Sequence, residues 1–432
     1  MPSNYKKRIW ITTDWEPNPL QEKSNHYGRM FSLSHYLSTH GYEVVLWFTT
    51  YIHPDKQYLY TEDTCIEVND NEKIELLHSN ICYKKNTSPT RFLYHSRLAN
   101  RMKKKCKDEL NYPKPDLIFC SYPPEQLCRF SIAYGKKNNV PVIVDARDQW
   151  PDIFERAFPS SLQKLANILL LPMKRRTAKV FREATALCAM SPVMLKWALD
   201  YADREKNELD KYVFIGSKNE QKIDSEFEKA LIEWNELDIS SETWNICLFT
   251  TLSKTAVDVD TVIQAVKIVH EQYPQIRLII GGRGDEEERL KQLVKNIPYI
   301  HMMGWMNQIQ MNSIMSISKV GMLCYRNTKD FKDGWGNKVG QYLSYGLPLF
   351  TSAEGFAKSY IEEHKCGIAY KEYDADGLAH EICDVIEEPE KYEMMAGQAK
   401  KCFTMEFDDT VVMEKFTDMI NSVCNKYYED KE

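Results

Sequence analysis

Polar side chains suited to binding phosphate lie in the glycine-rich stretch DGWGNKVGQ, which begins at Asp333 and ends at Gln341. Between these two residues lie Gly336, Asn337 and Lys338. Glycines let backbone N–H groups approach a bound anion, and the helix expected to follow adds a positive field at its N-terminus. The stretch predicts a loop that binds a phosphorylated ligand. A surface loop leading into an ordinary packing helix is the alternative.

Two further loops are candidates for the same ligand. The sequence IGGRGD at 280–285 places Gly282, Arg283 and Gly284 between an expected strand and an expected helix. Earlier in the second half of the chain, the hydroxyl of Thr251 and the charge of Lys254 are suited to holding a diphosphate. The alternatives are a tight turn that needs glycine without any ligand, and a helix cap with a solvated lysine. The GxGxxG spacing of a dinucleotide site is absent.

The first half of the chain offers a candidate base. Asp148 lies in the sequence VDARDQWP, just after an expected strand, where a carboxylate is suited to accept a proton from an acceptor hydroxyl. An ion pair between Asp148 and Arg147 that braces the turn is the competing interpretation. Three other residues are expected on this acceptor side, at strand ends or in the first loop. They are His26, Gly28 and Tyr122.

Alternating strand and helix patterns position these loops, and they predict an α/β protein with parallel sheets. Strands are expected at 8–14, 43–49, 116–122, 142–147, 186–191, 212–215, 246–250, 277–281, 299–304, 320–325, 348–352 and 367–371. Helices are expected at 27–40, 96–110, 125–138, 162–184, 258–270, 286–295, 308–317 and 358–363, and from 376 onward. The region between 50 and 95 shows no regular pattern.

A chain of 432 residues is too long for one compact core, so two domains are expected. We predict an N-terminal Rossmann-like domain at 1–205, a linker region at 206–242 and a C-terminal Rossmann-like domain at 243–404. A last helix at 405–432 is expected to pack back on the first domain. Ligands of open α/β sheets bind beyond the carboxyl ends of the strands, so a site in a cleft between the domains is expected.

Composition narrows the possible partners. The net charge of −6 excludes a nucleic-acid binder with a basic surface overall. The twelve cysteines include no CxxC pair, and no His/Cys cluster has metal-ligand spacing, so neither a metal nor another cofactor is predicted. Cys120, Cys188, Cys247 and Cys324 lie in apolar runs, which is typical of reduced, buried thiols in a cytoplasmic protein.

Two basic runs suggest contact with a membrane surface. Cations cluster at 101–107, and at 168–182 an apolar run is followed by a second group of cations. Such a combination can dock on anionic lipid headgroups, although a helix with a solvated charged face gives the same pattern. No apolar run is long enough to span a bilayer. A cytoplasmic protein, peripheral on the inner face of the membrane, is therefore expected.

Together these motifs resemble the retaining glycosyltransferases of family 4 (glycosyl transferases group 1), in particular those of bacterial surface-polysaccharide synthesis. The stretch from Asn337 to Pro348 is similar to the family's NKxxEYLxxGxP signature, and 144–151 is similar to its DxWP stretch. The resemblance implies a GT-B architecture of two Rossmann-like, doubly wound domains facing a cleft. The second domain would bind a nucleotide-sugar donor.

The resemblance also implies roles for single residues. The family's pair of glutamates falls on Asp333 and Gln341, so Asp333 would lie near the donor sugar and Gln341 would meet the ribose. Asp for Glu shortens the side chain, and Gln for Glu removes the charge but keeps an acceptor. Transfer would proceed with retention, without an enzymic nucleophile or a metal.

The implied function is transfer of a hexosyl or N-acetylhexosaminyl group from a UDP-linked donor. The acceptor would be a lipid-linked or growing cell-surface glycan, such as a capsule or lipopolysaccharide precursor. Two alternatives remain at this point: a nucleotide-sugar 2-epimerase on the same fold, and a non-catalytic GT-B-like partner subunit.

Overall fold

The computed structural model describes residues 6–16, 28–86, 88–156, 158–218, 224–328, 336 and 338–430 of the chain. These residues form two compact units. Unit 1 comprises Met1–Phe214 together with Met413–Glu432, and unit 2 comprises Ile215–Val412. The last part of the chain therefore belongs to the same unit as the first.

Unit 1 is built on an eight-stranded sheet with the order β10-β9-β8-β7-β1-β2-β6-β5. Its strands are β1 Arg8–Thr12, β2 Glu43–Thr49, β5 Thr64–Asn69, β6 Glu72–Leu77, β7 Leu117–Tyr122, β8 Val142–Ala146, β9 Ala186–Ala189 and β10 Lys211–Tyr212. All neighbours are parallel except β5 and β6, which form an antiparallel pair at the edge. A small separate hairpin joins β3 Tyr51–Ile52 to β4 Gln57–Tyr58. The strand order reverses beside β1, which is the usual place of a ligand site in such sheets.

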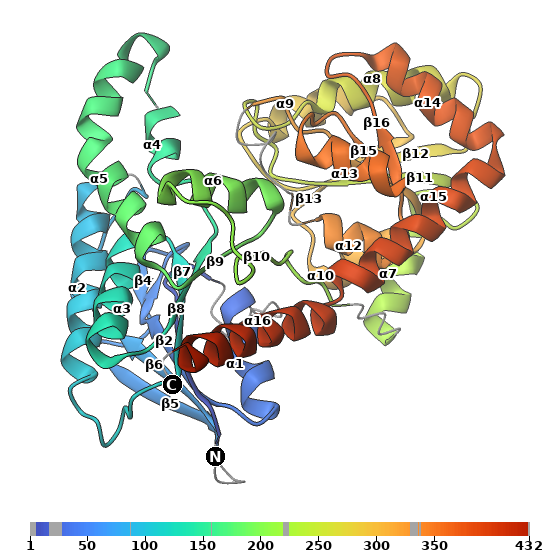
Figure 1. Cartoon of the computed structure of the whole chain (residues 1–432). Coiled ribbons are helices and arrows are strands. Elements are labelled where there is room, and N and C mark those ends of the chain that lie inside the picture. The colour runs from blue at the N-terminus through green and yellow to red at the C-terminus, as the bar shows by residue number, and fades with distance from the viewer. Residues whose placement is uncertain are drawn as a thin grey trace. The chain divides into compact units, whose positions relative to one another are not determined.

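Helices cover both faces of this sheet (Figure 1). On one side lie α2 Pro89–Lys105, α3 Glu125–Asn138 and α5 Gln163–Glu183, and on the other lie α1 Arg29–Thr39 and α16 Asp409–Glu429. The remaining helical segments of this unit are α4 Asp152–Arg156, the turn η1 Ser160–Leu162 and α6 Pro192–Ala202. The core on the α2–α3–α5 side includes the fully buried side chains of Trp10 and Phe181.

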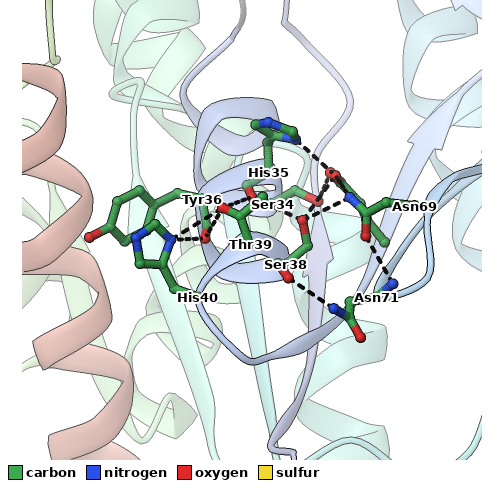
Figure 2. A network of polar contacts seen from close by, with 9 residues as sticks. Ser34, His35, Tyr36, Ser38, Thr39, His40, Asn69 and Asn71 are labelled. Atoms are coloured by element: carbon green, nitrogen blue, oxygen red, sulfur yellow. Dashed lines mark hydrogen bonds and ion pairs between the residues drawn. The ribbon is translucent and has the colours of Figure 1, made fainter.

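A buried carboxylate fixes the edge of the sheet to α1. Glu72 is 2% exposed and accepts hydrogen bonds from the hydroxyls of Ser34 at 2.6 Å and Ser38 at 3.2 Å. The Asn69 amide donates to the same carboxylate at 3.3 Å. Figure 2 shows how Ser34, Ser38 and Asn69 converge from the helix and the β5–β6 hairpin. The network satisfies the polar atoms that this edge buries.

The buried guanidinium of Arg29 connects three parts of unit 1. It lies 3.2 Å from the Asp145 carboxylate at the end of β8 and donates to the carbonyls of Val213 and Phe214 at 2.7 and 2.9 Å. Its other neighbour is the ring of Phe416 in α16, with 4.4 Å between the guanidinium carbon and the ring centre. The first helix, the sheet and the last helix thus share one buried cation.

Unit 2 has a six-stranded parallel sheet with the order β13-β12-β11-β14-β15-β16. Its strands are β11 Trp244–Phe249, β12 Ile276–Gly281, β13 Ile300–Gly304, β14 Ser318–Leu323, β15 Leu349–Thr351 and β16 Gly367–Ala369. Its helices are α7 Ser225–Glu236, α8 Val259–His270, α9 Glu287–Val294, α10 Gln308–Ser316, α12 Val339–Ser344, α13 Phe356–His364, α14 Ala375–Glu387 and α15 Pro389–Cys402, followed by the π-helical turn η2 Phe403–Phe407. In Figure 1, α8 and α14 lie on one side of this sheet and α10 and α12 on the other.

Three features differ from the sequence expectation. The region between 50 and 95 contains the β5–β6 hairpin and the start of α2, which begins at Pro89 rather than near 96 because Pro89 occupies the first helical turn after Ser88. The stretch 206–242 contributes β10 to unit 1 and α7 to unit 2. A helix at 192–202, α6, begins with the side chain of Ser191 accepting from the N–H of Met194. No helix among the described residues is long and apolar enough to cross a membrane.

Removing one partner of the Arg29–Asp145 pair should destabilise unit 1 strongly. Arg29→Met leaves the Asp145 carboxylate buried without its cation, and such changes cost about 3–5 kcal/mol. Urea denaturation measures the loss. Lys196→Met is the matched control, because Lys196 pairs with Asp200 at 2.9 Å on an exposed helix face, and we expect its loss to cost less than about 1 kcal/mol. Equal effects of the two changes would contradict the role assigned to Arg29.

Candidate functional site

Unit 2 contains a cavity of about 510 Å³ at the carboxyl edge of its sheet. The strand order reverses between β11 and β14, and the cavity lies beyond the ends of these strands and of β12 and β13. This is the position in which open α/β sheets bind ligands. The cavity is lined by Phe249, Thr250, Thr251, Ala256, Val257, Gly281, Gly282, Arg283, Trp305, Met306, Met311, Tyr325 and Lys338.

The glycine turn after β12 packs directly against the loop after β11. The N–H of Thr250 donates to the Gly281 carbonyl at 3.1 Å, and the N–H of Leu252 donates to the Arg283 carbonyl at 3.0 Å. Gly282 has φ +142°, and a Cβ atom there would lie 1.8 Å from the Thr250 carbonyl oxygen. A Cβ on Gly284 would lie 2.0 Å from the Leu252 carbonyl oxygen. Only glycine permits this approach, so the two loops form one continuous wall of backbone.

Two cations border the cavity without a carboxylate partner. The Arg283 side chain is exposed and makes no hydrogen bond or ion pair with any described residue. Lys338 is half-buried, and its Nζ lies 3.4 Å from the Met311 sulfur. Burial lowers the pKa of Lys338 from its ordinary value of 10.5. A half-buried ammonium with no anionic partner among the described residues favours binding of an anion from solution.

The short helix α12 is held against the sheet by Tyr342. The Tyr342 side chain is fully buried, and its hydroxyl accepts from the N–H of Phe249, the last residue of β11, at 2.8 Å. Its ring also occupies the space that a side chain at Gly321 would fill, since a Cβ there would lie 2.5 Å from the ring. One residue earlier, the Oε1 atom of Gln341 is buried and has no hydrogen-bond partner within the described ranges. The helix thus carries an unused acceptor in a fixed position.

The predicted donor-side residues fall into three groups. Thr251, Gly282, Arg283 and Lys338 line the cavity. Lys254, Gly284, Gly336 and Gln341 lie in the same loops or in α12 but are not among the lining residues. Asp333 and Asn337 lie outside the described residues. Gly336 sits close to the cavity wall, because a Cβ there would lie 2.4 Å from the hydroxyl of Tyr325.

In unit 1, a buried carboxylate gathers two histidines and a tyrosine just after β1. Asp14 accepts from the hydroxyl of Tyr94 at 2.8 Å and lies 3.3 Å from His53 Nε2 and 3.0 Å from His95 Nε2. Although burial opposes its charge, His53 and His95 hold the pKa of Asp14 well below its ordinary value. Burial lowers the pKa of His95 despite the neighbouring carboxylate. The cluster is a polar network at the carboxyl edge of the sheet.

Of the acceptor-side residues predicted in unit 1, Gly28 and Arg147 contact Glu16 at this edge. The Glu16 carboxylate pairs with Arg147 and caps α1 by accepting from the N–H of Met30 at 2.9 Å. A Cβ on Gly28 would lie 2.3 Å from the Glu16 carboxylate, so glycine makes room for this cap. Tyr122 is fully buried, which places it in the core rather than at an accessible surface. His26 lies outside the described residues.

Asp148 has an accessible side chain at the same edge. The surrounding protein nevertheless reduces its hydration and raises its pKa, while the charges of Arg147 and Arg91 act in the opposite direction. Arg147 has its ion pair with Glu16 rather than with Asp148. The described contacts contain no Asp148–Arg147 ion pair, the competing interpretation of this turn, although the charge of Arg147 acts on the Asp148 carboxyl.

Several residues of these sites were not predicted. Asp14, His53 and His95 come from segments far apart in the chain: Asp14 follows β1, His53 follows β3 and His95 lies in α2. His26 was expected to be the histidine of the site. The apolar lining by Trp305, Met306 and Met311 carries no signal in the sequence that distinguishes it from core. Within the described residues, no group of three or more His, Cys, Asp or Glu could hold a metal ion.

Comparisons with known proteins agree with this architecture. Residues 236–402 match the family model described as glycosyl transferases group 1. Among solved structures, the sucrose-phosphate synthase from Thermosynechococcus elongatus superposes with a TM-score of 0.66 at 12% identity, covering 97% of this chain and 99% of that one. By sequence alone, no curated protein matches the chain.

Two further solved structures are similar in the same way. Anabaena HepE in complex with UDP has a TM-score of 0.62 at 13% identity, covering 96% of this chain and 100% of its own. WaaG, a glycosyltransferase involved in lipopolysaccharide biosynthesis, has a TM-score of 0.59 at 14% identity, covering 96% and 99%.

The chain therefore has the GT-B fold of two Rossmann-like domains. Most of unit 2 matches the glycosyl transferases group 1 model. Family model and fold together support a glycosyltransferase, and the cavity at the strand ends of unit 2 lies within the matched segment.

Gly282→Ala should distort the cavity wall and destabilise unit 2. Both the positive φ and the 1.8 Å approach to the Thr250 carbonyl oppose a side chain, and we expect a loss of more than about 1 kcal/mol in the free energy of unfolding. Gly397→Ala is the control, because a Cβ at this helical glycine meets no atom within 4 Å, and it should be neutral or stabilising by up to about 1 kcal/mol. Thermal unfolding of both variants tests the difference. A neutral Gly282→Ala would contradict the described packing.

Proposed function

We propose that the protein is a retaining glycosyltransferase that transfers a hexosyl or N-acetylhexosaminyl group from a UDP-linked donor to a lipid-linked or growing cell-surface glycan. The observation that carries the proposal is the cavity of unit 2, where a glycine turn, Arg283 and Lys338 meet at the strand-order reversal. The HepE structures that resemble this chain contain UDP, UDP with glucose, or UDP-glucose. The volume of about 510 Å³ suits a ligand of this size.

The cavity offers donors for a diphosphate. The N–H groups of Thr251 and Arg283 donate to no described residue, and the side chain of Arg283 lies beside them. Lys338 also lines the cavity and contributes a point charge. In the proposed complex these groups stabilise the negative charge that develops on the leaving diphosphate. Gln341 offers its unused Oε1 to the ribose, and Asp333 acts near the donor sugar.

Retention of configuration needs no enzymic nucleophile in this proposal. The acceptor hydroxyl attacks on the face that the diphosphate leaves, and the departing phosphate oxygen takes the hydroxyl proton. Asp148, with its raised pKa, is proposed to orient the acceptor hydroxyl in unit 1. The protein thereby contributes positioning and charge stabilisation rather than a covalent intermediate.

A peripheral location on the inner face of the cytoplasmic membrane fits the surface of α5. Its N-terminal half exposes Leu165, Ile168, Leu169 and Leu171 by 42% to 68%. Arg175 follows on the same helix, is exposed, and has no ion pair with a described residue. Exposed leucines next to cations are suited to a bilayer surface with anionic lipids. The run at 101–107 adds the exposed Lys103, Lys104 and Lys107.

Turnover tests the proposal directly. The purified protein is incubated with a panel of UDP- and GDP-sugars and lipid-linked acceptors, and release of nucleotide diphosphate is measured. We expect release with a UDP-sugar only when an acceptor is present, and loss of release in Asp333→Ala. Conversion of the nucleotide sugar without an acceptor would instead identify an epimerase. Absence of UDP and GDP binding by calorimetry would favour a non-catalytic subunit.

The affinity for UDP should fall at alkaline pH. Burial lowers the pKa of Lys338, so its Nζ loses the proton at a lower pH than an ordinary lysine. Because the diphosphate favours the protonated form, binding is strongest below this lowered pKa and weakens as the pH rises through it. Calorimetric titrations with UDP between neutral and alkaline pH measure the decline. Lys338→Arg keeps its charge and should flatten the profile, and an unchanged profile would remove Lys338 from the site.

A further inference from the structure

Arg91 in unit 1 is enclosed by aromatic rings. It lies in the first turn of α2, and its side chain is 8% exposed. The guanidinium carbon is 5.0 Å from the ring centre of Trp15 and 4.7 Å from that of Trp150. Nη1 donates to the Asn86 carbonyl at 3.2 Å, whereas the buried Nε has no partner among the described residues. The cation is thus fixed in place with part of its donor capacity unused.

A second cation lies next to it. Lys56, in the turn between β3 and β4, has its Nζ 5.5 Å from the ring centre of Trp15 and 4.6 Å from that of Tyr83. Its Nζ donates to the side chain of Asn86 at 2.6 Å. Burial and the positive charge of Arg91 lower the pKa of Lys56. Lys56 and Arg91 therefore repel each other while sharing Trp15 and Tyr83.

The nearby carboxylates do not neutralise this pair. Neither Lys56 nor Arg91 forms an ion pair with a carboxylate in the part of the chain that the structure describes. Asp14 is occupied by His53 and His95. The charge of Arg91 acts on the Asp148 carboxyl, but no ion pair joins the two residues among the described contacts. Two neighbouring cations without a counter-charge favour an anion from solution.

The pair lies beside an exposed aromatic surface. Trp15 follows β1 at the carboxyl edge of the sheet and is 40% exposed, unlike most tryptophans of this unit's core. The ring of His53 packs on it with 4.5 Å between the ring centres, so only the remaining exposed part of the indole is open to a ligand. The face of an indole binds the apolar C–H surface of a sugar ring, and its edge leaves the ring hydroxyls in water. The combination of a flat aromatic surface and adjacent cations is suited to a sugar that carries a negative charge.

We propose that Trp15, Lys56 and Arg91 form a subsite for an anionic sugar, one that bears a phosphate or a carboxylate group. The sugar ring packs on Trp15, and its charged group accepts hydrogen bonds from Lys56 and Arg91. The identification of this sugar as part of the acceptor rests on the proposed function, whereas the binding itself does not. Simple packing of two cations around tryptophan is the competing explanation, and it predicts no ligand.

Direct binding to the full chain, without any nucleotide, tests the subsite. Glucose 6-phosphate, glucuronate and glucose are titrated by calorimetry, with tryptophan fluorescence as a second readout. We expect at least one anionic sugar to bind about tenfold more tightly than glucose, since charge-assisted hydrogen bonds exceed neutral ones. Preference for glucose 6-phosphate assigns a phosphate group, and preference for glucuronate assigns a carboxylate. Equal binding of all three, or no binding, would overturn the proposal.

Three variants locate the binding. Lys56→Met should weaken the anionic sugar about tenfold and leave glucose unchanged. Lys85→Met is the matched control, because Lys85 is an exposed neighbouring lysine whose side chain makes no hydrogen bond or ion pair with a described residue, and it should have no effect. Trp15→Leu should weaken all three sugars. Equal losses in Lys56→Met and Lys85→Met would reduce the effect to general surface charge and overturn the site.

A separate titration with UDP keeps the two proposals apart. UDP is proposed to bind unit 2, so Lys56→Met and Trp15→Leu should keep the wild-type affinity for UDP. Loss of anionic-sugar binding with UDP binding intact assigns the subsite to unit 1. Failure of UDP binding with the sugar preference intact would count against the proposed donor and leave the subsite standing. Loss of both UDP binding and anionic-sugar binding in one variant would show a folding defect, which circular dichroism of that variant detects. The variant Arg91→Lys, which retains the positive charge, is then tested in place of the misfolded variant.

Discussion

The absence of a side chain at Gly282 is the constraint on which the site of unit 2 depends. The Thr250 carbonyl oxygen occupies the space of a Cβ at this residue, and Gly284 repeats the arrangement against Leu252. The two backbone hydrogen bonds between these loops extend the pairing of β11 with β12 beyond the end of the sheet. As a result, Thr251 and Arg283 both line the cavity. A larger residue in the turn would separate the loops and these two residues.

Local patterns in the sequence predicted the elements whose signals are local. The expected strand 43–49 and helix 125–138 coincide with β2 and α3, because an apolar run and an amphipathic repeat each fix their own boundaries. The β5–β6 hairpin was missed, since its exposed strand alternates polar and apolar residues weakly and its stability comes from the buried contacts of Glu72. The predicted start of α2 near residue 96 is wrong, because the basic residues on which that prediction depends lie in the last turn of the helix.

The candidate sites also differ in how much of them the local sequence predicts. The glycine turn at 281–284 is visible in the sequence, because the need for glycine arises within one loop. The cluster around Asp14 is not, because Asp14 follows β1, His53 follows β3 and His95 lies in α2, and these segments are far apart in the sequence. Likewise, no pattern in the sequence around Arg91 predicts that its side chain lies between Trp15 and Trp150. The sequence shows which residue types suit a given chemistry. Whether those side chains come together in space depends on the register of the sheet.

Cations without a carboxylate partner occur at the carboxyl edges of both sheets, although the chain as a whole is acidic. With a net charge of −6, carboxylates are abundant, and many cations of the structure are paired with them. The cations at the carboxyl edges of the two sheets differ, because Arg283 and Lys338 in unit 2, and Lys56 and Arg91 in unit 1, have no described carboxylate partner. Lys338 and Lys56 are half-buried and Arg91 is buried, and leaving such a cation unpaired costs free energy, whereas the exposed Arg283 keeps its hydration. The cost is offset if an anion binds there, which gives both edges a common electrostatic explanation.

The cost of burying a charge also bears on Gln341. Family 4 enzymes, which this sequence resembles, have a glutamate at the corresponding position. The Oε1 atom of Gln341 is buried without a described donor, and a carboxylate in its place would lose more hydration than an amide does. The amide therefore costs less to bury than a carboxylate and still offers an acceptor. In the proposed complex, a hydrogen bond from a ribose hydroxyl to this amide would lack the additional strength of a charged acceptor, and more of the donor affinity would come from diphosphate contacts with the glycine turn, Arg283 and Lys338.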